Sequence, residues 1–338
     1  MAIENKNARI VGTNANRLAS YGLSGWTTQA DLPETRVIHF MAGGNKNSAI
    51  QTQGSKTGSD RYKNTTNLWN GSAWSTGNNN TVSKDYASGG GTTSGAISVM
   101  GYSGAAHQST QKYNGSTWSD AGNTGNSQYN TIADGNNSSA IQAQGTIGGS
   151  NQTNSASTYN GSSWSAITNS GNSGFGGQGG GTSSNFHIAG SYNTGGSINN
   201  SEKWNGSSWS AVTNPNVKKR NGQGGGNSTS GYIAGGNDMS NTTKTAESWD
   251  GSSWTSKDSM PEEKESAHHT STGSLSSSGG AIQVAGNSGS GGATDSKTCF
   301  TYAHADPINL QEGVTFEESD TGNNYVWYGS TWAEIPKG

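Results

Sequence analysis

The stretch Trp69-Asn70-Gly71-Ser72-Ala73-Trp74 decides the fold, because variants of it recur along the chain at a nearly constant spacing. Five copies consist of an aromatic residue, Asn or Asp, Gly, Ser, any residue and Trp, and their last residues stand 44 to 46 positions apart. These last residues are Trp74, Trp118, Trp164, Trp209 and Trp254. A degenerate sixth copy ends at Trp26, 48 residues before the first. A repeat of about 40–50 residues is typical of β-propeller blades.

The local chemistry of the repeat predicts strands. Asn-Gly between aromatic residues is a strong hairpin signal, because both residues accept a positive φ angle, so each copy is expected to join the two outer strands of a blade. Halfway between these turns lies a glycine-rich stretch, followed by a short strand that ends in glycine. Glycine permits close approach of backbones near the crowded axis of a propeller, which predicts inner strands there. Six such stretches occur, leading into the strands around Ile50, Ile97, Ile141, Ile188, Ile233 and Ile282.

Counting the two elements predicts how the ring closes. The sixth inner pair, which begins at Gly279-Gly280, runs on to Tyr302 without a following Gly-Ser-x-Trp turn, so its outer strand is missing. The copy around Trp26 supplies that strand, and closure removes unpaired sheet edges. We therefore expect an all-β chain with three parts: an N-terminal arm at residues 1–17, a six-bladed β-propeller at 18–302 closed by an N-terminal strand, and a C-terminal β-hairpin module at 303–338. The hairpin strands are expected at residues 313–318 and 325–328.

Several residues of the repeat resemble the kelch family of propellers. Pro33-Glu34-Thr35-Arg36-Val37-Ile38-His39 carries a proline, a basic residue and a histidine, and part of this pattern returns at Pro261, Lys264 and His268. Ile233-Ala234-Gly235-Gly236 is similar to the double glycine that ends a kelch strand. The resemblance covers about residues 18–302, although most copies lose one or more of these residues. It implies a kelch-like propeller with a binding surface and no single activity.

The Asn-Gly-Ser-Ser-Trp turns and the Ser/Asn/Gly-rich spacers also resemble proteins of tailed bacteriophages. The tail strengthens this resemblance, because residues 316–322 and 325–332 are similar to a short module near the ends of phage fibre and other virion proteins. The resemblance implies a virion structural protein, a fibre, knob or decoration, assembled in the host cytoplasm and exposed after lysis. Its expected partners are other virion proteins, copies of itself and a host-surface glycan. An ordinary hairpin packed on the side of the propeller is the alternative for the tail. The candidate attachment residues are Phe316, Tyr325, Trp327, Tyr328 and Trp332.

The composition indicates an ordered and uncharged chain. Charged residues make up 12% and the net charge is −3, while 11 Trp and 12 Tyr are present, which is unlike disordered chains. A near-neutral chain cannot neutralise the phosphates that dominate nucleic-acid affinity, so we expect no nucleic-acid partner. The run Lys218-Lys219-Arg220 is interpreted as a solvated loop. Residues 1–12 lack the apolar stretch of a signal peptide, and no segment reaches the roughly 18 apolar residues of a membrane span, so no membrane insertion is expected.

No catalytic, cofactor or metal residue is predicted. Residues 174–179 match a dinucleotide fingerprint formally, but no strand–helix unit accompanies them. A copper site like that of galactose oxidase is disfavoured, because the repeat explains the positions of His268, His269, Cys299 and Tyr302. No arginine triad of the sialidase type can be assembled. The single cysteine, Cys299, is interpreted as a small buried apolar residue.

A ligand site is expected on the face formed by the loops that follow each inner strand pair and the loops between blades. Aromatic side chains there could stack on sugar rings, which makes a lectin-like glycan-binding module the alternative function, with a polysaccharide-acting enzyme third. In the other interpretation, these side chains only cover neighbouring backbone. The candidates in the first set of loops are Tyr102, His107, Tyr192, Asp238 and Met239, and those near the second set are Tyr86, Tyr129 and Phe175.

Overall fold

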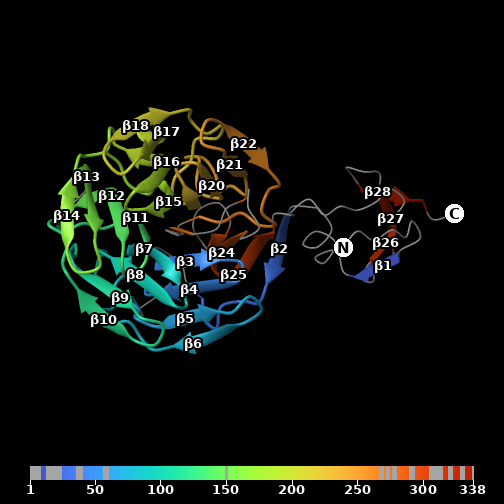
Figure 1. The fold of residues 1–338 in the computed structure, drawn as a ribbon, viewed down its shortest axis with the longest axis horizontal. Coiled ribbons are helices and arrows are strands. Elements are labelled where there is room, and N and C mark those ends of the chain that lie inside the picture. Colours follow the sequence, from blue (N-terminus) through green and yellow to red (C-terminus); the bar gives the residue numbers. More distant parts are fainter. Residues whose placement is uncertain are drawn as a thin grey trace.

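The structure, a computed structural model, consists of β-strands and loops. It describes residues 9–12, 25–35, 41–55, 61–148, 151–265, 270–271, 275, 280–288, 294–303, 315–318, 323–327 and 332–336. Within these ranges no helix occurs, and therefore none that is long and apolar enough to cross a membrane. The predicted all-β, six-bladed propeller is confirmed, and Figure 1 shows its blades arranged as a ring.

Five blades are complete four-stranded antiparallel meanders in which each strand pairs with the next along the chain. From the axis outward their strands are β3 (Met41–Asn45), β4 (Ser48–Thr52), β5 (Thr66–Trp69) and β6 (Trp74–Gly77); β7 (Ser88–Thr92), β8 (Gly95–Val99), β9 (Thr110–Tyr113) and β10 (Trp118–Ala121); β11 (Ile132–Gly135), β12 (Ala140–Ile147), β13 (Asn151–Tyr159) and β14 (Trp164–Ile167); β15 (Gln178–Thr182), β16 (Asn185–Asn193), β17 (Gly196–Trp204) and β18 (Trp209–Val212); and β19 (Gln223–Asn227), β20 (Ser230–Ala234), β21 (Ala246–Trp249) and β22 (Trp254–Lys257).

The sixth blade joins the two ends of the ring, as the sequence predicted. Strand β2 (Gly25–Gln29) pairs antiparallel with β25 (Thr294–Ala303), which pairs with β24 (Ala281–Ser288). Trp26 stands opposite Tyr302 in this register, just as Trp69 stands opposite Trp74 in the first blade. The degenerate copy of the repeat is therefore the outer strand of the last blade.

A short strand that was not predicted lies at the inner side of the blades. β23 (Thr270–Ser271) pairs in parallel with β19 and lies close to β3, β7, β11 and β15. The axis of the ring is therefore occupied by this short strand. Of the predicted inner pair, Gly280 immediately precedes β24, and Gly279 lies outside the described residues.

The glycines of the inner strands allow the blades to meet. A Cβ atom on Gly224 would collide with the backbone of Gly179 in the preceding blade, at 2.6 Å from its Cα. One blade departs from the glycine pattern, because β11 carries the fully buried Asp134. Its carboxylate accepts hydrogen bonds from the backbone of Gly135 at 2.7 Å and of Gly181, in the next blade, at 2.8 Å. The space that Gly90 leaves free is taken by this carboxylate.

The outer turns have a different geometry from the expected one. Gly71 has a φ angle of 97°, but Asn70 has no positive φ, so only one of the two residues uses the left-handed region. The Asn70 side chain explains the difference, because its Oδ1 accepts hydrogen bonds from the backbone N–H of Ser72 at 3.0 Å and of Ala73 at 2.9 Å. The same side-chain bonding occurs at Asn114, Asn160, Asn205 and Asp250.

The tryptophans that end these turns connect neighbouring blades. Trp74 packs against the buried cluster between the first and sixth blades that contains Cys299, whose thiol pKa is raised to about 12 by burial. The other five donate their indole N–H to the preceding blade. These bonds run from Trp26 to Asp258 O, Trp118 to Thr66 Oγ1, Trp164 to Thr110 Oγ1, Trp209 to Thr168 O and Trp254 to Thr213 O, at 2.9 to 3.0 Å.

The interpretation of Lys218-Lys219-Arg220 as a solvated loop is wrong for Lys219, which is fully buried. Its ammonium donates to the carbonyl and hydroxyl oxygens of Thr245 at 3.1 Å, and burial lowers its pKa to about 8. Lys84 and Lys264 occupy the same position of the repeat and are also buried. A buried lysine whose ammonium donates to a nearby oxygen is thus a recurring structural feature of these blades.

The C-terminal hairpin is confirmed between β26 (Thr315–Glu318) and β27 (Asn324–Trp327), within a larger sheet. Strand β28 (Trp332–Ile335) extends it on one side, and β1 (Arg9–Gly12) pairs in parallel with β26 on the other. Neither addition was predicted. Figure 1 shows this four-stranded sheet to one side of the ring.

Candidate ligand-binding face

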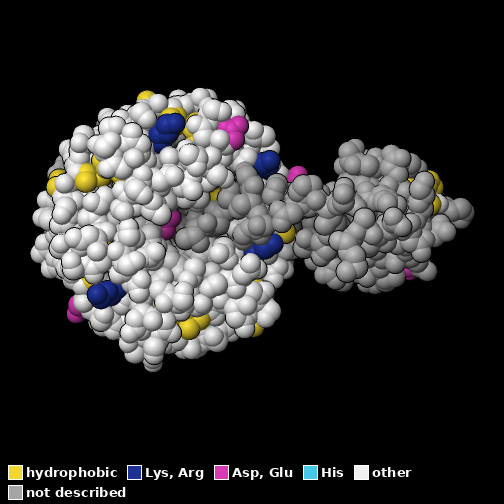
Figure 2. Space-filling view, viewed as in Figure 1, with side chains coloured by type: hydrophobic (Ala, Val, Ile, Leu, Met, Phe, Trp, Pro, Cys, Tyr) yellow, Lys and Arg dark blue, Asp and Glu magenta, His cyan; other side chains and the backbone are white. Residues whose placement is uncertain are grey.

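The loops that follow the second strand of each blade, and the loops that enter each blade, form one face of the propeller. Beyond a bulge, β12–β13 and β16–β17 continue as raised hairpins, with Ile147 opposite Asn151 and Tyr192 opposite Ser197. Among the described residues of the propeller, the exposed large apolar side chains are Ile147 and Met239, at 41% and 51%, and both belong to this face. Figure 2 shows one of the two faces of the ring, on which the charged side chains are few and scattered.

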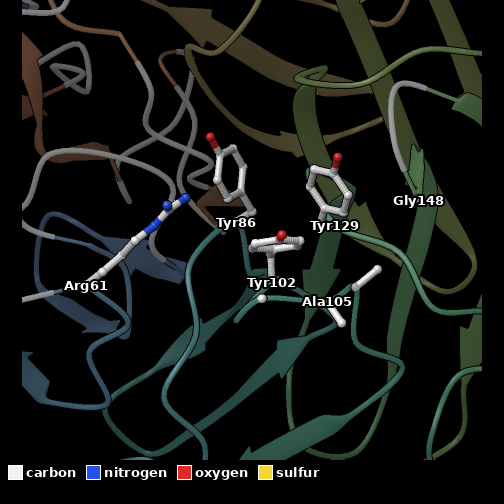
Figure 3. A pocket seen from close by; sticks show the side chains of 8 residues that line it. Arg61, Tyr86, Tyr102, Ala105, Tyr129 and Gly148 are labelled. Carbon is white, nitrogen blue, oxygen red and sulfur yellow. The ribbon is translucent and has the colours of Figure 1, made fainter.

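A cavity of about 540 Å³ opens on this face among the loops of the first three blades. Three tyrosines dominate it, Tyr86 and Tyr129 from the loops entering blades two and three, and Tyr102 from the loop after β8. The Tyr102 and Tyr129 ring centroids are 5.3 Å apart and those of Tyr86 and Tyr129 are 5.6 Å apart. Figure 3 shows the three rings gathered around the cavity, with Arg61 on one side and Ala105 and Gly148 on the other.

Arg61 gives the cavity its cationic wall. Its side chain is 55% exposed and its Nε lies 3.3 Å from Oδ2 of the buried Asp85. Burial raises the pKa of Asp85 to about 6, although the guanidinium beside it acts in the opposite direction. The backbone of Asp85 exchanges two hydrogen bonds with Tyr102, at 2.9 and 2.7 Å, so the carboxylate and the ring are held by one bridge. The guanidinium also lies over Tyr62, 5.1 Å from the ring centroid.

The backbone of Tyr86 is strained. Its φ angle is 52°, in the left-handed region, where a bulky side chain is disfavoured by about 1–2 kcal/mol. The residues at the same position of later blades are Asn130, Gly176 and Asn221, with φ angles of 59°, 67° and 53°. Asn and Gly tolerate this conformation, so the repeat requires the backbone shape but not a tyrosine. The tyrosine is therefore explained by the cavity that it lines.

The other candidate residues have different environments. Phe175 and Tyr192 form a second aromatic pair with centroids 5.1 Å apart. His107 is not among the residues that line the cavity; its Nε2 lies 2.6 Å from the Ser103 hydroxyl, and desolvation lowers its pKa. Asp238 is a turn residue, because its carboxylate accepts backbone hydrogen bonds from Asn241 and Ser240, which lower its pKa.

The sequence did not single out Arg61 as a binding residue. The feature that could have indicated it is its position next to Tyr62, in the long loop between β4 and β5. In the described part of the chain, no group of three His, Cys, Asp or Glu side chains is arranged to hold a metal ion.

The attachment candidates lie in the C-terminal sheet, where Phe316 stands opposite Tyr325 and Trp327 opposite Trp332. Tyr328 lies outside the described residues.

Comparison with known proteins supports the fold. No protein-family model and no curated protein matches the sequence. Among solved structures, one titled "Structure of YjhT" is similar, with a TM-score of 0.63 and 10% sequence identity over 80% of this chain and 95% of that one. At this identity the similarity concerns the propeller fold alone.

Proposed function

We propose that this chain is a non-catalytic virion protein of a tailed bacteriophage, whose propeller binds a glycan of the host surface through the tyrosine cavity. The observation that carries the binding role is the convergence of Tyr86, Tyr102 and Tyr129 on one cavity. Aromatic rings offer apolar faces to the C–H groups of a sugar, while their hydroxyls remain available for hydrogen bonds. Concave sites with aromatic walls and a few polar groups are typical of small-ligand sites.

The strain at Tyr86 supports the proposal independently of the cavity. Residues in disfavoured backbone conformations cluster at functional sites, where the surrounding fold compensates for their cost. Asn occupies this position in blades three and five, so relief of the strain is chemically simple. A tyrosine at this point is consistent with selection for ligand contact.

The virion role rests on the phage-like turns and on the C-terminal module. The sheet of β1, β26, β27 and β28 combines both ends of the chain into a unit outside the ring. Among the described strands, β1 and β28 are its edges, and edge strands are suited to pairing with another protein. We assign attachment to this sheet and ligand binding to the propeller face.

The binding role is tested on a glycan array with the wild-type chain and the variant Tyr102→Ala. Binding to a defined set of glycans, lost in this variant, is the expected result. Asn237→Ala is the matched control, because Asn237 occupies the position of Tyr102 in blade five, pairing with Arg220 as Tyr102 pairs with Asp85. Absence of binding to any glycan, or equal binding by Tyr102→Ala, would contradict the role.

The virion role is tested separately by mass spectrometry of purified particles from a lysate that contains this protein. A fixed copy number per particle is expected. Glycan binding by a protein that is absent from particles would leave a lectin and overturn the virion assignment.

A further inference from the structure

The region of Phe175, Tyr192 and Arg220, called here the second platform, repeats the chemistry of the tyrosine cavity on blade four. The two rings pair at 5.1 Å, and the Arg220 guanidinium lies 4.3 Å from the centroid of Tyr192. All three side chains are partly exposed. The backbones of Phe175 and Tyr192 exchange hydrogen bonds at 3.0 and 2.8 Å, which fixes the platform near the tip of the raised β16–β17 hairpin.

The repeat itself does not demand aromatic residues at these positions. In blades two to six, the loop that enters the blade forms an antiparallel bridge with the loop or hairpin that follows the second strand of that blade. In blades two to four this bridge carries at least one aromatic residue, whereas in blades five and six it joins only polar or charged residues. The bridges are Asp85–Tyr102, Tyr129–Thr146, Phe175–Tyr192, Arg220–Asn237 and Glu265–Asn287. The aromatic residues therefore form an arc over three consecutive blades.

The cavity and the second platform are neighbours on this arc. Gly148, at the tip of the raised β12–β13 hairpin, lines the cavity, and Gly145 of the same hairpin donates a hydrogen bond to Gly174, beside Phe175, at 2.7 Å. The two raised hairpins also touch, since Thr194 N–H donates to Oε1 of Gln152 at 3.1 Å. Ile147, which is 41% exposed, adds an apolar side chain on the β12–β13 hairpin.

We propose that the ligand is an extended oligosaccharide that occupies the tyrosine cavity, crosses the β12–β13 hairpin and continues onto the second platform. This inference rests on the proposed glycan-binding function and adds the length of the ligand to it. One aromatic site is enough to bind a single sugar. Two aromatic sites in adjacent blades, joined by an exposed apolar residue, suit a chain of several sugars that presents successive ring faces.

The experiment measures affinity against ligand length by calorimetry with the full chain. The probes are the best glycan of the array and its own fragments, from a single sugar to the full length. In the wild type, affinity should rise at least about tenfold from the short fragments to the long ones. Tyr192→Ala and Phe175→Ala should remove this rise and leave the affinity for the shortest binding fragment unchanged. Tyr102→Ala should weaken every fragment, and Asn237→Ala should match the wild type.

The outcomes separate the two proposals. If affinity does not depend on length, or if Tyr192→Ala weakens short and long fragments equally, the second platform is overturned and the glycan cavity stands. If no glycan binds and a host protein binds instead, both are overturned. Tyr192→Leu, which keeps an apolar side chain of similar bulk, repeats the measurement should Tyr192→Ala melt below the wild type.

Discussion

The indole of Trp26 meets the phenol ring of Tyr302 edge to face, with centroids 5.3 Å apart and planes at 68°. An aromatic pair at similar separation, but tilted instead of edge to face, occurs at every complete outer turn, for example between Trp69 and Trp74 at 5.4 Å and 44°. In five blades the partners are five residues apart in sequence, whereas in the sixth they come from opposite ends of the propeller. The ring is thus closed by an aromatic pair at the same register position as the pair at each complete outer turn.

Deletion of residues 1–30 should open the ring. This deletion removes β2 and leaves β25 with an unpaired edge, so aggregation or loss of cooperative melting is expected. Calorimetry and size-exclusion chromatography measure both effects. Deletion of residues 1–12 is the control, because it removes β1 and spares β2. A monomer without residues 1–30 that melts like the wild type would contradict the closure.

Gly224→Ala should destabilise the propeller strongly. The added methyl group meets the Gly179 backbone of the neighbouring blade, which cannot rotate away, and overpacking of this kind costs about 1–3 kcal/mol or more. Denaturant unfolding measures the loss. Gly125→Ala is the matched control, because no atom lies within 4 Å of its added Cβ, and its stability should stay within about 0.5 kcal/mol of the wild type. Equal stability of the two variants would show that the inner strands have room.

His187→Ile should flatten the acid side of the stability profile. His187 is fully buried in β16 and desolvation lowers its pKa from 6.5 to about 4, so the unfolded chain binds the proton first. The contribution of His187 to the free energy of unfolding is fully present above pH 6.5. It falls by about 3 kcal/mol between pH 6.5 and 4 and does not change further below pH 4.

Isoleucine is the appropriate replacement for His187, because Ile97 and Ile141 occupy its register position in blades two and three. The free energy of unfolding of His187→Ile relative to the wild type should rise as pH falls from 7 to 4. Urea unfolding at several pH values measures this difference. A constant difference would mean that the histidine is accessible to protons in the folded state.

Tyr86→Asn should separate stability from binding. Asparagine relieves the strain of the left-handed backbone, but the edge-to-face contact with Tyr129 is lost, so the two effects of about 1 kcal/mol each nearly cancel. The melting temperature should therefore stay close to that of the wild type, while glycan affinity falls at least about tenfold. Retained affinity in this variant would remove Tyr86 from the site.

Removal of residues 308–338 should leave a folded propeller and weaken oligomerisation or attachment to particles. The deleted segment contains β26, β27 and β28, none of which pairs with a propeller strand. Thermal melting reports the fold, and incorporation into particles reports attachment. Unfolding of the truncated chain would make the tail part of the propeller, and normal incorporation would refute the anchoring role.

The sequence predicted those elements whose signal is local and repeated. The blade count followed from the repeated turns and glycine-rich stretches, and the closure followed from the incomplete copy at Trp26. Both were visible because a hairpin turn is marked by its own residues. β23 was missed because Thr270-Ser271 has neither glycine nor an aromatic residue to mark it. β28 could have been found, since Trp327-Tyr328-Gly329-Ser330-Thr331-Trp332 has the spacing of a propeller turn and Trp327 pairs with Trp332 in the same register.

Long-range placement was beyond the sequence. The parallel pairing of β1 with β26 joins the two ends of the chain and has no local signature. The burial of Lys219 depends on a threonine oxygen 26 positions later. Tyr86, Tyr102 and Tyr129 were assigned to loops of one face one by one, but their convergence with Arg61 on a single cavity depends on how three blades pack.

Closure by β2 also implies a delay in the folding of the newly made chain. Gly25–Gln29 leaves the ribosome early, but its partner strand is complete only at Ala303 of 338 residues. At about 5–20 residues per second, β2 waits roughly 15–60 s for that partner. Meanwhile five blades can form on an open ring. We therefore expect domain swapping on a polysome, in which β2 of one nascent chain completes the last blade of its neighbour.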